Sequence, residues 1–491
     1  YMDYVASVVS TELDVPFDEV RERLDFSKRK ERVLANGMEK AKADGLKVAL
    51  ENAGIRGLHM RNGVERFYPG GSRMAHILGY VDHDQIGREG VERTFNSVLS
   101  GEDGYRYIQV DRKGREISAY RGDEQAAKPG ADIHLSIDGD LQLIVEQEIA
   151  KAQEEFRADR MMAVLVDPFT GDILALANTP SFDPNTREGE RKNCLLTDVY
   201  EPGSTFKLIA AAAALDIGVV SPRTVIHCHH GYFAEGKLSI KDHHPYGDLT
   251  VGGVLQKSSN IGAFMLARMA GMKTYYRYAS KFGFGRRTGI ELTAEARGTV
   301  RKTGNLIDFS RLSYGYAVNT TPLQVAMAYA AVANGGNLMR PRLLTKVVAK
   351  NGELIRQTRP QILERVVTSS TASHLRTMLQ SVVSEKGTAK RAAIPGYTAA
   401  GKTGTTKKIN PKTNRYYDSR YMTSFAGFAP ATDPEVVCVI VADNPHPRDD
   451  IPAYGGTVAA PVFSRIMRRV LAHRDVQPTL PIEDEALSAS R

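Results

Sequence analysis

The segment EPGSTFKLIAAAAALD, residues 201–216, constrains the fold more than any other part of this sequence. Pro202 and Gly203 interrupt the chain, and the apolar residues after Lys207 predict a helix without a polar face near its start. Such a helix is buried on most sides, so other elements must pack around it. The lysine at its beginning is then expected in the interior, where a charged group is costly unless something compensates it.

Ser204 stands just before this helix and admits two interpretations. A serine in front of helix formers is a common N-cap, because its hydroxyl accepts from an orphan backbone N–H group. Alternatively, Ser204 is a nucleophile, since Lys207 lies one turn away on the same face and its amine can reach the hydroxyl. The spacing alone does not decide. Ser27 and Lys30 repeat it within a charged segment typical of a solvated helix face.

Composition limits the class of protein and its partners. The 491 residues are 42% hydrophobic and 25% charged, which suits two or three globular domains. The net charge of +8 is dispersed, so it favours solubility or a nearby anionic surface over nucleic-acid binding.

Three cysteines are too few for a disulfide scaffold. No apolar run reaches 18 residues, and because the sequence begins within a polar helical pattern, we expect that an upstream anchor or export segment has been removed.

The order of elements predicts an α+β protein with two domains and a tail. Residues 1–130 alternate charged helical patterns with strand-like strings such as RFYPGG and YRYIQVDRKGREI, which predicts an elongated α+β domain rich in surface. A hinge is expected at Pro129 and Gly130. Residues 131–473 form the second domain, and residues 474–491 form a polar tail.

The second domain is expected to be an antiparallel sheet with helices packed on it. A helix with apolar residues from Leu141 to Phe156 follows Asp138, a plausible cap. The string MMAVLVDPFTGDILALAN predicts a hairpin. Three further strands are predicted by YTAAGKTGTT, TSFAGFAP and EVVCVIVAD, and a last helix by AAPVFSRIMRRVLAH.

Lys207 can act as a base if it is neutral. A neutral lysine amine can activate a serine when burial and a nearby cation lower its pKa by about 3 units. Lys402 in GKTGTT is the candidate cation, because the small residues around it suit a strand that lines a ligand cleft. Between the two motifs, Ser258 in KSSN could pass a proton, and Asn260 could donate to and accept from a peptide bond.

Two other matches are interpreted as coincidental. Lys302, Thr303 and Gly304 repeat Lys-Thr-Gly, but no apolar strand pair follows, and we expect a turn. The stretch GYTAAGKT, residues 396–403, matches a phosphate-binding loop. That site requires a helix directly after the lysine, and the glycine, β-branched threonines and Pro411 that follow exclude one.

Ser-x-x-Lys, Ser-x-Asn and Lys-Thr-Gly in this order form the known motif set of serine acyl-transfer enzymes that act on penicillin and D-alanyl peptides. From about Arg66 to Leu471 the sequence resembles a class B penicillin-binding protein, a peptidoglycan transpeptidase, and most closely the cell-division (septal) type. The family's usual N-terminal membrane helix is absent from this sequence, and Thr406 stands where the family often has alanine. The resemblance is carried by RFYPGGSRMAHILGY, GREGVERTFNSVLSGEDGYRYIQVDRKGREI, VLVDPFTGDILALANTPSFDPN, YEPGSTFK, KSSNIGA, TTPLQVAMAYAAVANGG, AAGKTGTT and TSFAGFAP.

The resemblance implies a fold and a set of roles. The fold is a five-stranded antiparallel sheet packed between helices, preceded by an elongated pedestal or dimerisation-type domain. Ser204 would attack the carbonyl of the penultimate D-alanine, and Lys207 would be the base. Ser258 would relay the proton to the leaving nitrogen, and Lys402 would hold the charge of the network.

The same resemblance implies the substrate-binding residues. Asn260 would bind the peptide backbone, and Thr403 and Thr405, with Gly404 between them, would bind the terminal carboxylate. The backbone N–H groups of Ser204 and Thr405 would form the oxyanion hole, and no cofactor or metal is implied.

The implied ligands and partners are stem peptides ending in D-Ala-D-Ala, β-lactam antibiotics, a membrane glycan polymerase and division proteins, with no nucleic acid. The implied location is the bacterial inner membrane, with the catalytic domain in the periplasm. Two alternatives stay open: a serine β-lactamase or lactam sensor, which needs a deacylating base, and a division scaffold with a vestigial enzyme fold.

The string HCHHGYFAEGKLSIKDHHPYG predicts a hairpin rich in metal-ligand residue types. Cys228, Asp242, His243 and His244 could bind zinc. The favoured interpretation is that the histidine pair makes hydrogen bonds beside the buried helix, so no metal site is predicted.

Overall fold

The computed structural model describes residues 1–25, 33–35, 38–60, 65–112, 117, 124–410, 412–413, 415–447 and 452–481. By their internal contacts, the residues separate into two compact units. The first comprises Tyr1–Pro69 and Val81–Ile86, and the second comprises Gly70–Tyr80 and Gly87–Arg491. Ser27 and Lys30, the second serine–lysine pair of the sequence, lie outside the described residues.

The first unit is a small helical assembly with a core of its own. Its helices are α1 (Met2–Leu13), α2 (Phe17–Arg23) and α3 (Lys40–Asn52). Apolar residues at helical spacing face one another and exclude water, whereas the remaining faces are charged. The buried core consists of Val5, Ala6, Val9, Leu13, Val20, Leu24, Leu46, Leu50 and Ile55.

Two strand predictions for residues 1–130 were wrong or too long. RFYPGG, residues 66–71, forms no strand: a turn begins at Pro69, because Pro69 and the glycines after it favour a turn over a ladder. In YRYIQVDRKGREI, β1 spans only Tyr105–Arg106 and pairs with β2 (Glu124–Gln125), with exposed side chains and no buried face to extend the pairing.

The segment around Pro129 and Gly130, expected to be a hinge, is instead bonded on both sides. Lys128 pairs with Glu102, and the Ala131 N–H donates to the Val98 carbonyl. Gly130 lies so close to Leu99 that a Cβ would be 2.0 Å from its carbonyl oxygen. The short helices of this region are α4 (Ala75–Leu78), α5 (Gly90–Thr94) and α6 (Asn96–Leu99).

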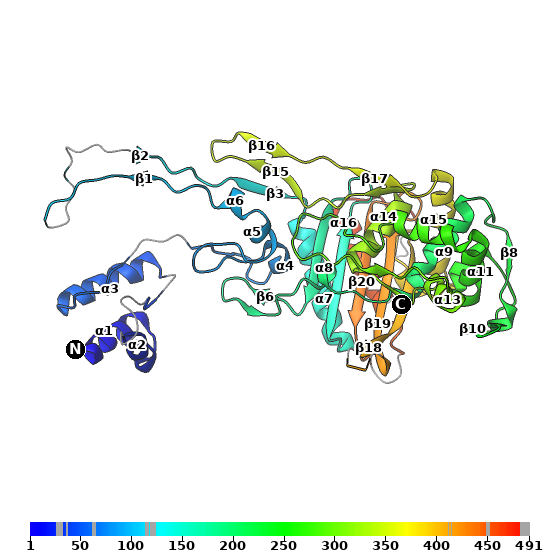
Figure 1. Ribbon diagram of the computed structural model, residues 1–491, viewed down its shortest axis with the longest axis horizontal. Helices are drawn as coiled ribbons and strands as arrows, with labels where there is room; N and C mark the ends of the chain where they lie inside the picture. Colours follow the sequence, from blue (N-terminus) through cyan, green and yellow to red (C-terminus); the bar gives the residue numbers. More distant parts are fainter. Residues whose placement is uncertain are drawn as a thin grey trace, which may run out of the picture. The chain divides into compact units, whose positions relative to one another are not determined.

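The second unit is built on a five-stranded antiparallel sheet, as predicted (Figure 1). The predicted hairpin supplies its β4 and β5, and the three late strings supply the other strands. The order across the sheet is β18 (Ala400–Asn410), β19 (Arg415–Ala429), β20 (Val436–Asp443), β4 (Arg160–Val166) and β5 (Ile173–Thr179).

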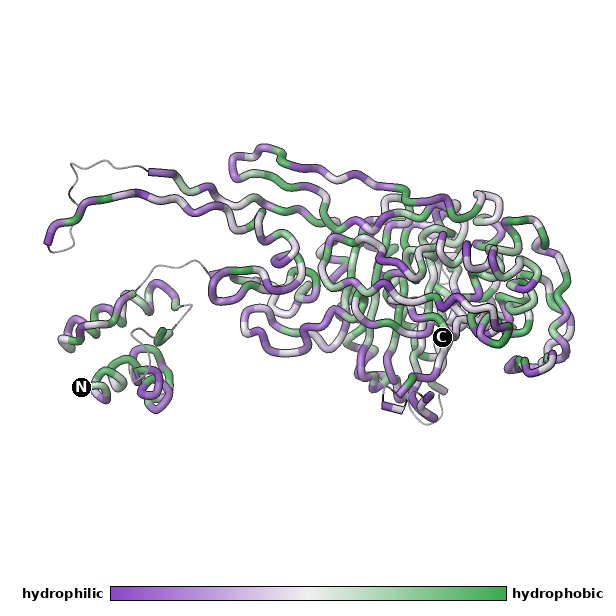
Figure 2. Tube along the Cα trace, in the orientation of Figure 1, coloured by the Kyte–Doolittle hydropathy of each residue, from purple (hydrophilic) through white to green (hydrophobic). Residues whose placement is uncertain are grey.

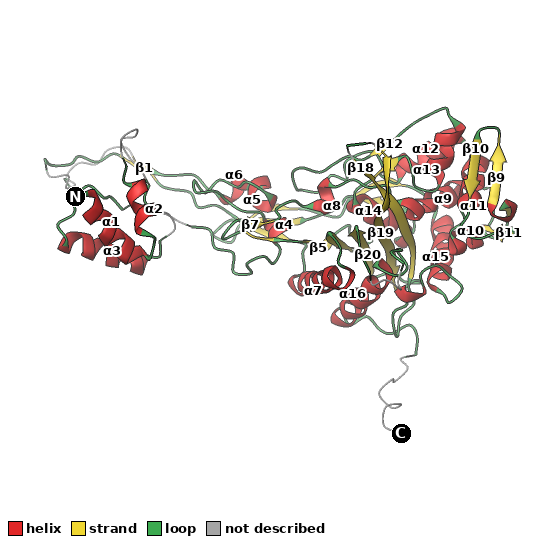
Figure 3. Ribbon diagram, turned by 90° about the horizontal axis from the view of Figure 1, so that it is seen from below, coloured by secondary structure: helices red, strands yellow, loops and turns green. Residues whose placement is uncertain are grey.

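Helices cover both faces of this sheet (Figure 3). On one face lie α7 (Gly139–Phe156) and α16 (Ala459–His473). The Asp138 carboxylate caps α7 by accepting from two N–H groups of its first turn, as predicted. On the other face lies α14 (Pro322–Ala333), whose residues are all buried. The sheet therefore forms the middle layer of a three-layer α+β domain.

The apolar helix predicted after Ser204, α9 (Lys207–Asp216), lies deep in this unit, with every residue but the last buried. Figure 2 shows hydrophobic residues recurring along the tightly packed segments of this unit. Its helical neighbours are α10 (Val251–Lys257), α11 (Asn260–Ala270), α12 (Met272–Lys281), α13 (Leu306–Ser313) and α15 (Ser369–Val383).

Smaller elements complete the unit. Hairpin β9–β10 is antiparallel, as the histidine-rich string predicted. The strands and short helices are β3 (Asp132–Leu135), β6 (Phe182–Asp183), β7 (Glu188–Gly189), α8 (Cys194–Thr197), β8 (Val225–His227), β9 (Tyr232–Glu235), β10 (Leu238–Lys241), β11 (Asp248–Thr250), β12 (Thr299–Val300), β13 (Val318–Asn319), β14 (Asn337–Met339), β15 (Leu344–Val348), β16 (Leu354–Gln357) and β17 (Ile362–Arg365), with 3-10 turns at η1 (Gly203–Phe206), η2 (His229–Gly231) and η3 (Lys390–Ala392).

The beginning of the predicted tail is attached to the second unit. The Tyr397 hydroxyl donates to the Val476 carbonyl, and the Thr479 hydroxyl accepts from the Thr398 N–H. No helix among the described residues has the length and apolar character needed to cross a membrane.

Candidate active site

Ser204 lies in the 3-10 turn η1, directly before α9. Its side chain caps neither η1 nor α9, so the capping interpretation is wrong. The turn is held against β18 by close packing at Gly203, where a Cβ would lie 2.7 Å from the Thr406 methyl carbon. Gly203 has φ +56° and its N–H donates to the Gly315 carbonyl. Only glycine fits this turn without strain or collision.

Two buried lysines meet at Ser258. Lys207 Nζ donates to the Ser258 carbonyl oxygen at 2.5 Å and to its hydroxyl at 3.1 Å. Lys402 Nζ donates to the same hydroxyl at 3.0 Å. Lys207 is 1% exposed and Lys402 is 0% exposed. The fold therefore gathers all three motifs, although the expected bond from Lys207 is made to Ser258 and not to Ser204.

Burial makes these lysines unusually acidic. Desolvation lowers the pKa of Lys207 to about 7, an effect that the negative charge of Asp242 partly opposes. Desolvation also lowers the pKa of Lys402 well below its ordinary value, and the positive charge of Lys207 adds to this effect. Two ammonium groups around one hydroxyl repel each other, so a neutral amine is available near neutral pH. A neutral lysine amine can accept the proton of a serine.

Ser258 occupies a left-handed turn between two helices. Its φ of 60° and ψ of 39° are unusual for a residue with a side chain, and they end α10. Ser259 begins α11 and accepts from the Gly262 N–H. Sequence reasoning found Ser258 and Asn260 by their motif but not this strained turn, of which the sequence gives no sign besides two serines between apolar helical patterns.

Asp242 is a residue that sequence reasoning considered only as a zinc ligand. Its carboxylate accepts from the Ser259 hydroxyl at 2.5 Å and from the N–H groups of Asn260 and Ile261 at 2.5 and 3.1 Å. The Asn260 side-chain N–H donates to the Lys241 carbonyl at 2.9 Å. The Ser-x-Asn motif is thus held by the chain just after β10.

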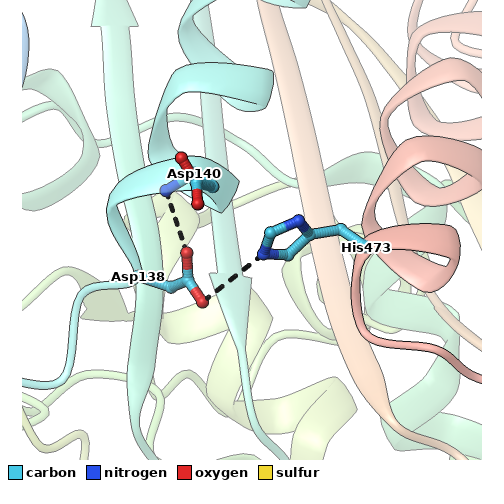
Figure 4. A group of neighbouring side chains, drawn as sticks. All are labelled: Asp138, Asp140 and His473. Atoms are coloured by element: carbon cyan, nitrogen blue, oxygen red, sulfur yellow. Dashed lines mark hydrogen bonds and ion pairs between the residues drawn. The ribbon is translucent and has the colours of Figure 1, made fainter.

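The candidate zinc ligands are not gathered. Cys228, Asp242, His243 and His244 bring no three ligand atoms within 4.8 Å of one another. Within the described part of the chain, the only group that meets this criterion is Asp138, Asp140 and His473 (Figure 4). These side chains are half-buried or exposed, Asp138 already caps α7, and His473 Nε2 lies 4.0 Å from its carboxylate. Capping and an ion pair account for this group, so we assign no metal to it.

The strand with Lys-Thr-Gly approaches the Ser204 turn closely. A Cβ on Gly404 would lie 2.4 Å from the Ser424 hydroxyl oxygen and 2.7 Å from the Pro202 carbonyl oxygen, so any larger residue collides. The Thr405 hydroxyl accepts from the Gly455 N–H at 3.0 Å. The Thr403 hydroxyl lies 3.4 Å from that of Thr388. Because β18 is the outermost strand of the described sheet, its free edge can pair with an extended peptide.

Glu201 is a site residue that sequence reasoning missed. Its carboxylate accepts from the Ala317 N–H and from the Tyr416 hydroxyl, each at 2.9 Å. Its carbonyl oxygen accepts from the Thr406 hydroxyl at 2.9 Å. Burial raises the pKa of Glu201. Glu201 and Thr406 therefore connect the Ser204 turn to β18 and β19, and the only signal in sequence was an acid beside Pro202 in an otherwise apolar setting.

The two coincidental matches form no site, although residues 302–304 lie in an irregular loop with a bend at Gly304 and not in the expected turn. Lys302 is exposed in the loop before α13, where the Thr303 N–H donates to the Tyr276 hydroxyl. Lys402 is followed by eight more residues of β18 and not by a helix, so residues 396–403 have no phosphate-binding helix terminus.

Two family models match the chain. The Penicillin binding protein transpeptidase domain matches residues 161–468, and the Penicillin-binding Protein dimerisation domain matches residues 2–135. The chain therefore belongs to the class B penicillin-binding proteins, in agreement with the resemblance carried by its motifs.

The chain is also similar to individual proteins of known name and to solved structures. The chain is similar to peptidoglycan D,D-transpeptidase FtsI of Escherichia coli K12, with 36% identity over 474 residues, 95% of this chain and 76% of the relative. It is also similar to penicillin-binding protein PbpB of Mycolicibacterium smegmatis, with 36% identity over 428 residues, 84% of this chain and 65% of the relative. Among solved structures, penicillin binding protein 3 of Mycobacterium tuberculosis complexed with aztreonam has a TM-score of 0.75 and 34% identity, covering 85% of this chain and 92% of that chain.

Proposed function

We propose that this protein is a peptidoglycan D,D-transpeptidase that cross-links stem peptides through an acyl-enzyme on Ser204. The observation that carries the proposal is the pair of buried lysine amines on the Ser258 hydroxyl, beside the turn that holds Ser204. The similarity to FtsI supports the same reaction class.

In the proposed acylation, Lys207 in its neutral form accepts the hydroxyl proton of Ser204. The Ser204 oxygen then attacks the carbonyl carbon of the penultimate D-alanine. The C–N bond breaks, and Ser258 passes the proton from Lys207 to the leaving nitrogen, which departs as D-alanine. Lys402 remains beside Ser258 and balances the charge of the relay.

The acyl group then moves to an amine of a second stem peptide. The amine nitrogen attacks the acyl carbon, the bond to the Ser204 oxygen breaks, and the proton that the amine nitrogen loses is returned to that oxygen. We assign the backbone N–H groups of Ser204 and Thr405 to the oxyanion, because β18 packs against η1 at this point. Asn260 is assigned to the peptide backbone, and Thr403 and Thr405, on either side of Gly404, to the terminal carboxylate.

We also propose a role for each of the two domains. Residues 131–473 would be the catalytic domain and residues 1–130 a non-catalytic domain, which the two family matches support. We infer that the protein acts in septal wall synthesis with its catalytic domain in the periplasm, held at the inner membrane by an anchor. A membrane glycan polymerase and other division proteins would be its partners.

Intact-protein mass spectrometry with benzylpenicillin tests the proposal. The wild type should gain the mass of one benzylpenicillin and keep it for hours, and Ser204→Ala should gain nothing. Rapid return of the wild type to its free mass would instead identify a β-lactamase. No adduct on either protein would refute acyl transfer and leave a scaffold role.

A further inference from the structure

Asp242 lies where the Ser-x-Asn turn meets the chain after β10. Its own N–H donates to the Gly231 carbonyl at 3.0 Å, so its backbone position is held independently of its side chain. The carboxylate accepts from a hydroxyl and two backbone N–H groups at the start of α11. Three donors on one carboxylate immobilise both it and the segment that donates.

The immobilised segment includes the strained residue of the site. Ser258 is in the left-handed region, which a residue with a side chain adopts only when its surroundings enforce it. On one side the end of α10 holds it, through the Ser258 and Ser259 N–H groups on the Leu255 and Val254 carbonyls. On the other side the next two residues are bonded to Asp242. Removal of Asp242 would release one of the two constraints that aim the Ser258 hydroxyl.

The negative charge of Asp242 also affects the protonation of Lys207. The titratable groups that face Lys207 are Lys402 from β18, and Asp242 and His243 from the segment after β10. Lys402 and His243 are positive when protonated, and each disfavours a charge on Lys207. Asp242 is the carboxylate whose charge opposes the loss of the Lys207 proton.

We propose that Asp242 is a positioning residue of acyl transfer: its carboxylate holds the left-handed turn at Ser258 and presents a negative charge to the buried lysine pair. The proposal rests on the proposed function, because it assigns Asp242 a task in that reaction. Its substrate class is the same, an acyl donor that ends in D-Ala-D-Ala or a β-lactam.

The test is the second-order acylation rate with benzylpenicillin between pH 5 and 9 for the wild type, Asp242→Asn and Asp248→Asn. Asp248 is the matched control, an exposed acid on β11 that pairs with His227 at 2.6 Å. Asp242→Asn should acylate about tenfold more slowly at pH 8, because an amide cannot accept all three bonds and the turn loosens. The fall of its acylation rate at low pH should also move to lower pH, because the negative charge that favoured protonated Lys207 is gone. Asp248→Asn should behave as the wild type.

A conservative variant separates positioning from charge. Asp242→Glu keeps the charge but displaces the carboxylate by one methylene. Its pH–rate profile should therefore keep the wild-type midpoint, and its acylation rate should be reduced. The same variant carries the test if circular dichroism shows that Asp242→Asn does not fold. A rate for Asp242→Asn equal to that of Asp248→Asn, an unmoved midpoint, or a full rate for Asp242→Glu would each overturn the proposal.

The two proposals fail in different ways. If the wild type is not acylated at any pH, acyl transfer itself is refuted, and the role of Asp242 with it. If the wild type is acylated and Asp242→Asn matches Asp248→Asn at every pH, only the role of Asp242 is refuted.

Discussion

The tripeptide Lys-Thr-Gly occurs twice in this chain, in two different environments. In the loop before α13, the Lys302 side chain is exposed to solvent. On β18, Lys402 is fully buried, and its Nζ lies 3.0 Å from the Ser258 hydroxyl oxygen. Burial and the neighbouring cation lower the pKa of Lys402 well below its ordinary value. The same tripeptide therefore places its lysine in solvent in one copy and in the buried interior beside Ser258 in the other.

The residues after each tripeptide help to explain the difference. Asn305 follows the first copy, and its side chain caps α13 by accepting from the Ile307 N–H at 2.8 Å. Thr405 and Thr406 follow the second copy, and their β-branched side chains favour continuation of the strand. The chemistry available to each lysine therefore depends on where the residues after the tripeptide place it.

Removal of each lysine is the strongest test of the comparison. Lys402→Ala should lower the acylation rate by about 10³-fold, because Ser258 loses the partner that holds it in the proton relay. Lys302→Ala should leave the rate within about twofold, as expected for an exposed side chain. Stopped-flow acylation by a chromogenic cephalosporin measures both. Equal losses in the two variants would contradict the distinction drawn between the copies.

The pH dependence of acylation tests the role of the other buried lysine, Lys207. Lys207 acts as a base only when neutral, and its pKa is about 7. The rate should therefore rise with pH up to about 7 and level off above it, and should be about 100-fold lower at pH 5 than at pH 8. Lys302→Ala should not move this limb. A rate that is flat from pH 5 to 8 would exclude Lys207 as the base.

The central glycines of the two copies form a second matched pair. A Cβ on Gly404 would lie 2.4 Å from the Ser424 hydroxyl oxygen, whereas a Cβ on Gly304 would meet nothing within 4 Å. Gly404→Ala should lower the free energy of unfolding by about 2 kcal/mol and slow acylation by about 30-fold, because β18 must shift from the Ser204 turn. Gly304→Ala should change neither. Urea denaturation and acylation kinetics measure the two effects. Unchanged stability and rate in Gly404→Ala would show that the close contact between β18 and the Ser204 turn is not required.

The residues that continue each copy carry the smallest expected effects. Thr406→Ala should cost about 1 kcal/mol of unfolding free energy through the lost bond to the Glu201 carbonyl, and slow acylation by at most about threefold. Asn305→Ala should cost about 1 kcal/mol through the lost cap and leave acylation unchanged. Thermal denaturation with acylation rates separates them. A larger kinetic loss in Asn305→Ala than in Thr406→Ala would reverse the assignment of the active copy.

Local patterns predicted much of this fold. The Asp138 cap, the β4–β5 hairpin, the three late strands and α16 lie where their residues predicted, because periodicity and turn residues act over short distances. The predictions that failed were RFYPGG as a strand and the hinge at Gly130. RFYPGG failed as a strand because Pro69 and the glycines after it favour a turn. The hinge at Gly130 failed because distant backbone bonds to the residues on both sides of it.

Local sequence patterns were sufficient to predict that Lys207 is buried and that Ser204, Ser258 and Lys402 belong to one motif set. The packing of the whole chain was needed to show that Lys207 contacts Ser258, 51 residues later in the sequence. It was also needed to show that Asp242 and Glu201 hold the turns that carry the serines. Helical and strand periodicities are encoded by near neighbours. The pKa of a lysine and the contacts of a buried carboxylate depend on which distant segments exclude water around them, and only the complete packing of the chain decides that.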